Sequence, residues 1–311
     1  MKKTYHNKLL VAVDGSDRSI QTAQYLSAIT SFTNHDICFF HVFNKIPESY
    51  YDLSREPSSI SPFSSVLAWE TQQRGHMEEH MDQCRQLLLA ADFHPDRIKT
   101  VIHNRRVGVA RDIMAEARKG YDALVIRRRG LGRLHGLVMG SVAFKLLNSA
   151  DLPPLLFAAR KPFNRRILIA VDGSDNAMRA VTFAGQKLAA GGCSFRIVNV
   201  LRGDFMLHQT SPHKMEVRES FGSAESAISA FLDAARDHLI ASGVAADKVS
   251  VEIVRDAPSR AAAIVQVAEE NHYHTIVLGR KGSSRVREFT IGRVSSKALQ
   301  IGRELGVWIV Q

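Results

Sequence analysis

The sequence predicts an α/β protein made of two similar halves, each with a parallel sheet. Short apolar runs alternate with helix-spaced segments along all 311 residues, a pattern typical of strands joined by right-handed helical crossovers. The hexapeptide AVDGSD occurs at residues 12–17 and again at residues 170–175. A glycine loop also occurs twice, with Gly130 and Gly282 lying 152 positions apart. The chain is therefore a duplication.

In the first half, residues 8–13 form a continuously apolar run, as expected for a strand buried on both faces. A turn follows, and Ser16 or Asp17 is a suitable N-cap for a helix that continues to about residue 30. Residues 43–65 are rich in Ser, Pro and Tyr without a period, which predicts a long surface loop. Further strands are predicted at residues 36–42, 97–103, 122–126 and 155–159, and further helices at residues 65–91, 107–119 and 141–149.

The second half repeats this order of elements. Pro258 fits the first position of a helix, where its missing N–H is tolerated. Strands are predicted at residues 166–171, 194–200, 248–254, 274–278 and 306–310, helices at residues 176–190, 221–242, 258–271 and 292–303, and a loop at residues 201–219. Ligands of such doubly wound sheets bind at the carboxyl ends of the strands, where the strand order reverses.

Length and composition agree with two domains. A chain of 311 residues, 45% of them hydrophobic, can bury two ordinary cores, since a domain typically contains about 100–200 residues. We expect one domain at residues 1–160 and a second at residues 161–311.

The charge and the cysteines restrict the partners and the compartment. The net charge of +10 mostly reflects Lys and Arg spread over predicted helix surfaces. The dense cluster Arg127-Arg128-Arg129 has no interleaved aromatic residues, so nucleic acid is only a minor alternative. Three widely spaced cysteines without a C-x-x-C motif favour a reducing cytoplasm. No signal-like segment and no apolar run of about 18 residues is present, so we expect neither export nor a membrane partner.

The two motifs together carry a family resemblance. A strand that ends in Val-Asp-Gly-Ser and is followed, about 110 residues later, by a G-x-x-G-x9-G-[ST] loop resembles the universal stress protein family. Both halves contain this combination with one departure each in the glycine loop, so the resemblance is to the tandem form of the family. It implies flavodoxin-like (adenine nucleotide alpha hydrolase-like) domains, each with a five-stranded parallel sheet in the order 3-2-1-4-5. It also implies ATP binding where the glycine motif is complete.

Asp14 and Asp172 end the first predicted strand of each half. A carboxylate at this point could accept hydrogen bonds from a ribose or a base, or reach a metal ion on the phosphates. The alternative is that it only caps the next helix or stabilises the turn. In the family the matching aspartate lies in the nucleotide pocket. The resemblance also places Val42 and Val200, at the ends of the second strands, where the backbone meets adenine.

The glycine loops would hold the phosphates. Glycine allows positive φ and a close approach of the backbone, and the first N–H groups of the next helix attract anions. We expect tighter binding in the C-terminal half, because Arg127 replaces the first glycine in the N-terminal half and can occupy the space of the ligand. The loop residues are Gly279, Gly282, Gly292 and Arg293, the last in place of Ser or Thr, and Gly130, Gly140 and Ser141.

Two function classes remain. The first is a stress-response or regulatory protein that binds an adenine nucleotide: ATP, or ADP or AMP, with Mg²⁺ on the phosphates. The second is a nucleotide-independent dimerisation or interaction module whose glycine loops are degenerate. Neither loop ends in Gly-Lys-Ser or Gly-Lys-Thr, so we expect at most slow ATP hydrolysis. The sequence leaves the protein partner and further homo-oligomerisation open.

The fifth strands predict how the halves meet. Residues 155–158 and 307–310 are apolar and, in the family strand order, would be sheet edges. An exposed apolar edge invites pairing with another strand. The link between the halves is short, so we expect these two edges to face one another across a pseudo-twofold axis and the chain to form a built-in dimer of domains.

Overall fold

The computed structural model describes residues 7–44, 62–128, 139–149, 151–160, 162–201, 214–282 and 291–311. The first half contains strands β1 (Lys8–Ala12), β2 (Asp36–Phe43), β3 (Ile98–Asn104), β4 (Ala123–Ile126) and β5 (Leu155–Phe157), with helices α1 (Asp17–Ser27), α3 (Pro62–Leu89), α4 (Val109–Ala117) and α5 (Ser141–Leu147). The second half contains strands β6 (Arg166–Val171), β7 (Ser194–Val200), β8 (Val249–Val254), β9 (Thr275–Gly279) and β10 (Gly306–Val310), with helices α6 (Asp175–Leu188), α8 (Lys214–Ala241), α9 (Arg260–Glu270) and α10 (Arg293–Ile301).

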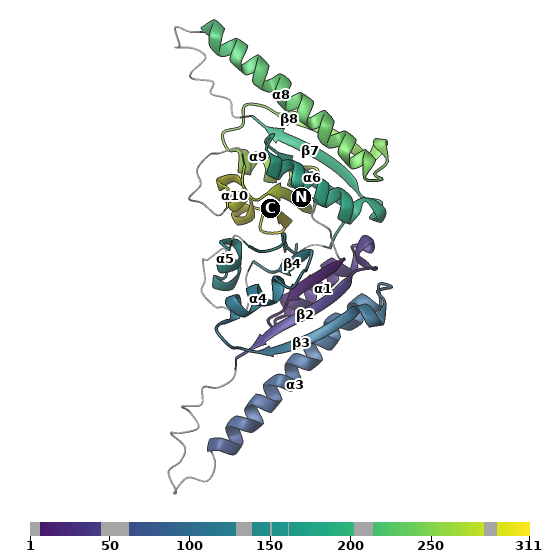
Figure 1. The fold of residues 1–311 in the computed structure, drawn as a ribbon, viewed down its shortest axis with the longest axis vertical. Helices are drawn as coiled ribbons and strands as arrows, with labels where there is room; N and C mark the ends of the chain where they lie inside the picture. Colours follow the sequence, from purple (N-terminus) through teal and green to yellow (C-terminus); the bar gives the residue numbers. More distant parts are fainter. Residues whose placement is uncertain are drawn as a thin grey trace.

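The described strands form one continuous sheet of ten strands. Their order is β3-β2-β1-β4-β5-β10-β9-β6-β7-β8. Pairs within each half are parallel, whereas β5 and β10 pair antiparallel. Figure 1 shows the two halves stacked along the long axis, with α3 and α8 at opposite ends. The predicted α/β class with two parallel-sheet repeats is confirmed.

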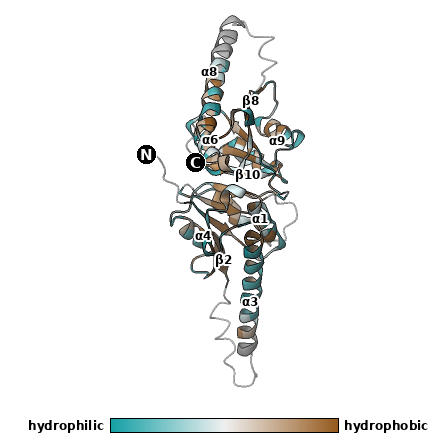
Figure 2. Cartoon of the chain, turned by 90° about the vertical axis from the view of Figure 1, so that its right-hand side faces the viewer, coloured by the Kyte–Doolittle hydropathy of each residue, from teal (hydrophilic) through white to brown (hydrophobic). Residues whose placement is uncertain are grey.

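Helices cover both faces of the sheet. Successive side chains of a strand point to opposite faces. Leu9 and Val11 belong to one hydrophobic cluster, which includes residues of α1, α3, α6 and α8, and Leu10 belongs to a second, which includes residues of α4, α5, α9 and α10. Each of these two hydrophobic clusters contains residues of both halves. Figure 2 shows hydrophobic residues concentrated around the sheet and hydrophilic residues along much of α3. The halves therefore share their cores.

The fifth strands form the seam between the halves. Val307, Trp308 and Ile309 pair with Phe157, Leu156 and Leu155, and all six residues are buried. The Trp308 Nε1–H donates to the Tyr25 hydroxyl at 3.1 Å. The edge contact expected from the apolar fifth strands is thus present as backbone pairing, and the buried Trp308 and Tyr25 side chains pack beside it.

Several boundaries differ from the expectation. Helix α8 begins at Lys214, so the last residues of the predicted loop at residues 201–219 are helical and that boundary is wrong. Residues with high helix propensity extend the helix here, although their sequence shows no apolar periodicity. Pro258 does not open α9. Ser259 is its N-cap, and the Ser259 hydroxyl accepts the Ala262 N–H at 3.4 Å. Most of the predicted loop at residues 43–65 lies outside the described residues.

Helices α3 and α8 each contain 28 residues. Among the described helices, including these two, none has an apolar stretch long enough to cross a lipid bilayer.

Candidate functional site

In the C-terminal half, the ends of β6 and β9 bring two predicted site residues together. Asp172 follows β6, and Gly282 lies three positions beyond the end of β9. A Cβ atom added to Gly282 would lie 2.3 Å from the Asp172 Oδ2 atom. The carboxylate therefore lies directly against the glycine backbone, and any side chain at position 282 would have to displace it.

The turn after β6 orients the Asp172 carboxylate. The Ser174 N–H donates to the Asp172 Oδ1 atom at 3.2 Å, and Gly173 between them has a φ of +79°, which glycine adopts readily. The N-cap of α6 is Ser174, because its hydroxyl accepts the Ala177 N–H at 3.2 Å. Asp172 is thus not required as the helix cap, the alternative role considered for it.

The other two glycines of this loop lie at close backbone contacts. A Cβ atom on Gly279 would lie 2.9 Å from the backbone of Asn176, at the start of α6. The Gly292 N–H donates to the Arg280 carbonyl at 2.7 Å, which ties the start of α10 to the end of β9. Gly279, Gly282 and Gly292 all lie outside the left-handed φ region. Of the two reasons expected for glycine here, positive φ and close backbone approach, close approach therefore explains these glycines.

Arg293 is the first residue of α10, and its side chain is exposed. A hydroxyl is present two residues later, where the Ser295 Oγ–H donates to the Gly279 carbonyl at 2.7 Å. That hydroxyl holds the end of β9 against α10 rather than replacing the Ser or Thr of the motif.

The end of β7 supplies Val200 and Asn199, and sequence reasoning missed Asn199 as well as Arg260 of α9, which contacts Val200. Val200 is buried, and its carbonyl accepts from the Arg260 Nε–H at 3.2 Å. The Asn199 side chain donates to the Val171 carbonyl at 2.8 Å, just before Asp172. The Asn199 Oδ1 atom is buried and has no hydrogen-bond partner in the described part of the chain. A buried acceptor without a donor is expected where a ligand is missing.

In the N-terminal half, Asp14 is held by a tighter set of contacts. Its Oδ1 atom accepts from the Ser16 hydroxyl at 2.6 Å and from the Ser19 hydroxyl at 2.9 Å. The Ser16 side chain consequently makes no cap hydrogen bond to α1. The Asp14 Oδ2 atom is buried and finds no hydrogen-bond partner among the described residues, so one carboxylate oxygen remains for a ligand.

Two histidines lie around Asp14 and were also missed. The ring Nδ1 of His41 lies 2.9 Å from the Val13 carbonyl, the position that Asn199 takes in the other half. Burial lowers the pKa of His80, on α3, and the nearby charge of Asp14 opposes this shift. The duplication could have identified His41, because residues 41 and 199 occupy equivalent positions in β2 and β7.

The N-terminal loop is closed like the C-terminal loop. The Gly140 N–H donates to the Arg128 carbonyl at 2.6 Å. Gly140 is the N-cap of α5, and Ser141 is its exposed first residue. Val42 is buried at the end of β2. Gly130 lies outside the described residues.

The side chain of Arg127 extends toward the seam between the halves. Its guanidinium donates to the Ala159 carbonyl at 2.8 Å and to the Gln21 Oε1 atom at 3.0 Å. Burial, together with the charges of Arg160 and Arg18, lowers the pKa of Arg127 to about 10. The replacement of the first glycine therefore adds a charged side chain at the junction of the halves.

Within the described ranges, no three His, Cys, Asp or Glu side chains come together as metal ligands. Mg²⁺ commonly uses one or two carboxylates together with substrate phosphates. Asp172 suits that arrangement, because it offers a single carboxylate beside a glycine loop.

The comparisons with known proteins agree with the duplicated α/β fold. The model of the universal stress protein family matches residues 6–157 and again residues 164–301. The chain is similar to a universal stress protein from Archaeoglobus fulgidus DSM 4304, with 19% identity, 100% of this chain and 99% of that chain covered, and a TM-score of 0.64. It is also similar to a protein of unknown function from Pseudomonas aeruginosa PAO1, with 15% identity, coverages of 98% and 92%, and a TM-score of 0.56. A search of curated proteins gave no significant match. The chain belongs to the universal stress protein family and carries two copies of the family's domain.

Proposed function

We propose that this protein binds an adenine nucleotide in the crevice of its C-terminal half and acts in stress response or regulation. ATP is the first candidate, with ADP and AMP as alternatives. One observation carries the proposal: the Asp172 carboxylate lies against the backbone of Gly282. A carboxylate beside a glycine loop at the carboxyl ends of parallel strands is the arrangement expected where a ribose and its phosphates bind.

Each part of the crevice suits one part of the ligand. The backbone near Gly282 and Gly292, together with the start of α10, would hold the phosphates, and Arg293 would add a charge-assisted contact. Asp172 would turn from Gly282 toward the ribose or a phosphate-bound Mg²⁺. The buried Asn199 Oδ1 atom, which lacks a partner in the described part of the chain, would accept a hydrogen bond from the ligand.

The N-terminal crevice is proposed as a weaker second site. The Asp14 Oδ2 atom is a free acceptor as far as the described residues show. However, Arg127 takes the place of the first glycine, so the end of β4 lacks the close backbone approach that glycine allows, although the Arg127 side chain itself turns toward the seam.

One observation favours the interaction module as a second candidate. Each glycine loop carries an arginine at its second residue, Arg128 in the first half and Arg280 in the second. Each arginine reaches across the seam and donates to carbonyls of the opposite half. A glycine loop that holds the two halves together has a structural role that requires no bound nucleotide. In that case the loops would stabilise the assembly and bind no ligand.

Calorimetric titration of ATP with Mg²⁺ into the purified protein tests the first proposal. The parent should bind, and Gly282→Val should lose the tighter site, because the added side chain would occupy the space of the phosphates and displace Asp172. Gly130→Val, at the equivalent position of the other half, is the matched control and should retain that site.

Circular dichroism should show that both variants are folded. Mass spectrometry of small molecules released from the purified protein should identify ATP, ADP or AMP. Unchanged ATP binding by Gly282→Val would contradict the assignment to the C-terminal half. If the parent releases no nucleotide and gives no heat on titration, the interaction module is the better description.

A further inference from the structure

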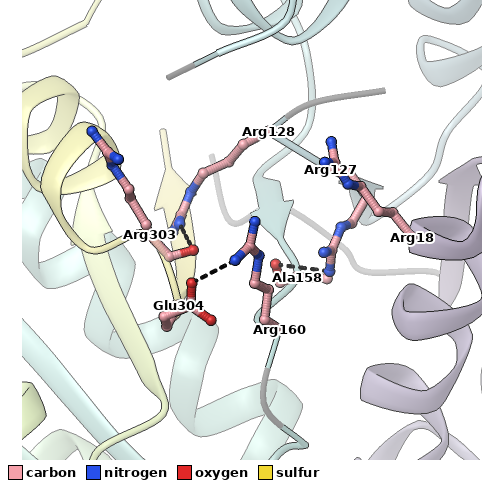
Figure 3. A pocket seen from close by; sticks show the side chains of 7 residues that line it. All are labelled: Arg18, Arg127, Arg128, Ala158, Arg160, Arg303 and Glu304. Carbon is pink, nitrogen blue, oxygen red and sulfur yellow. Dashed lines mark hydrogen bonds and ion pairs between the residues drawn. The ribbon is translucent and has the colours of Figure 1, made fainter. Parts of the chain in front are cut away.

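A cavity of about 230 Å³ lies at the seam between the two halves, and neither strand-end aspartate is among its lining residues. Its lining comes from α1, the end of β4, the segment after β5 and the segment before β10. Figure 3 shows Arg160 projecting between Arg128 and Arg127. The lining residues are Arg18, Arg127, Arg128, Ala158, Arg160, Arg303 and Glu304.

Five guanidinium groups face one carboxylate in this lining, and that carboxylate is engaged. The Glu304 Oε1 atom accepts from Arg160 at 2.8 Å. Arg127 instead donates to a backbone carbonyl and to an amide oxygen. Arg128 donates to the carbonyls of Gly302, Arg303 and Leu305 at 2.6–2.7 Å. Neutral acceptors orient a guanidinium but do not neutralise it, so the cavity keeps a strong positive charge.

Burial and neighbouring arginine charges lower the pKa of Arg127 and Arg128. Burial is the main cause that lowers the pKa of Arg128 to about 10, and the charge of Arg127 lowers it further. The pKa of Arg127 is lowered to about 10 by burial and then by Arg160 and Arg18. A bound anion would relieve this repulsion.

Arg128 also has a donor without an acceptor. Only 9% of the residue is exposed, and its buried Nε–H has no hydrogen-bond partner in the described part of the chain. A buried unsatisfied donor is costly, and native proteins rarely retain one without a partner such as a ligand or water.

The arrangement is not a by-product of the duplication. Arg128 has the equivalent Arg280 in the second half, and both reach across the seam. The other arginines have no such counterpart. By the spacing of the repeats, Gly279 matches Arg127, Asn176 matches Arg18, and Asp151 matches Arg303. Holding the halves together therefore accounts for Arg128 and leaves the rest of the positive charge unexplained.

We propose that this cavity binds a small phosphate anion with two or more negative charges: free pyrophosphate or the phosphate chain of a nucleotide. Guanidinium groups bind phosphate oxygens through paired, charge-assisted hydrogen bonds. Pockets that enclose a whole drug-sized ligand measure about 300–1,000 Å³, so this smaller cavity suits the phosphates alone. The anion would contact Arg127 and Arg160 from the first half and Arg303 from the second, and so connect the halves.

The test uses inorganic pyrophosphate as the probe, in calorimetry and thermal unfolding at low ionic strength. The parent should bind it and unfold at a higher temperature than in chloride of equal ionic strength, because a ligand of the folded state stabilises it. Arg127→Gln and Arg18→Gln should each weaken pyrophosphate binding by about tenfold or more. Arg236→Gln, which removes an equal charge from an exposed position of α8, is the matched control and should bind like the parent.

Two further titrations identify the source of the phosphate. They use a background that combines Gly282→Val with Gly130→Val, which removes both proposed nucleotide crevices and should leave pyrophosphate binding intact. ATP binding that remains there and is lost on adding Arg127→Gln indicates a nucleotide chain. Binding of pyrophosphate without ATP indicates a free anion.

Two results would overturn the inference. One is an absence of pyrophosphate binding by the parent at millimolar concentration. The other is equal pyrophosphate binding by the parent and the folded Arg18→Gln and Arg127→Gln variants.

Discussion

Arg128 and Arg280 are equivalent residues of the two repeats, and each donates hydrogen bonds to carbonyls at or just after the C-terminal end of the last helix of the opposite half. Arg280 binds the carbonyls of Leu147 and Ser149 at 2.6 and 2.5 Å. Arg128 binds carbonyls in the segment after α10. A positive charge near the C-terminus of a helix complements its dipole. The carbonyl of each arginine also accepts the N–H of the last glycine of its loop, Gly140 or Gly292. The same two residues therefore contact both the glycine loops and the seam.

We expect Arg280→Met to lower the free energy of unfolding by about 2–3 kcal/mol, because hydrogen bonds from a charged group are lost and two carbonyls lose their donor. Chemical denaturation followed by circular dichroism measures this. Arg236→Met is the control at an exposed position and should change stability by less than about 0.5 kcal/mol. Equal losses in both variants would show that the cross-seam contact contributes little.

A second contact across the seam is an ion pair shielded from water. The Lys187 Nζ atom, on α6, lies 2.7 Å from the Asp122 Oδ2 atom, just before β4, and both residues are buried. Lys187→Met should destabilise the protein by about 3–5 kcal/mol, since Asp122 then stays buried without its cation. The double variant Lys187→Met with Asp122→Leu should recover much of this loss. Denaturation of the two variants side by side tests the prediction, which fails if the double variant is the less stable one.

His35 should make stability depend on pH. Its Nε2 atom lies 3.2 Å from the Lys187 Nζ atom, and burial, followed by that charge, lowers the pKa of His35 from 6.5 to about 4. The unfolded state therefore binds the proton first as the pH falls. The stability that neutral His35 provides is complete above pH 6.5 and is lost between pH 6.5 and about 4, at up to about 1.4 kcal/mol per pH unit.

His35→Gln should reduce the slope of unfolding free energy against pH within this window and leave it unchanged above pH 7. His94→Gln, at an exposed histidine, is the control and should keep the parent's slope. Parallel slopes for parent and His35→Gln would disprove the role of His35.

Two glycines should respond oppositely to alanine. A Cβ atom on Gly306 would lie 2.8 Å from the Tyr25 hydroxyl, whereas a Cβ atom on Gly75, inside α3, would meet nothing within 4 Å. Gly306→Ala should cost about 1–3 kcal/mol through overpacking. Gly75→Ala should stabilise by about 0.5–1 kcal/mol, because alanine is the better helix former. Thermal unfolding should separate the two variants on either side of the parent.

Sequence reasoning reached the repeat and the fold class because both depend on local patterns. Continuous apolar runs predict buried parallel strands, and AVDGSD repeats the same turn after β1 and β6. It failed at Pro258 and at the start of α8, where capping and helix propensity determine the boundary. It left open whether the glycines of the C-terminal loop serve positive φ or close backbone approach, and the structure shows close approach.

The amino-acid sequence by itself determined the two-domain organisation and the residues at the ends of the strands, because these follow from short patterns along the chain. Only the tertiary structure decided that Asp172 lies on Gly282, that Lys187 pairs with Asp122, and that Arg127 turns toward the seam. These contacts join residues far apart in sequence. One partner of Arg127 is a backbone carbonyl, a group that every residue carries and that therefore leaves no signal in the sequence.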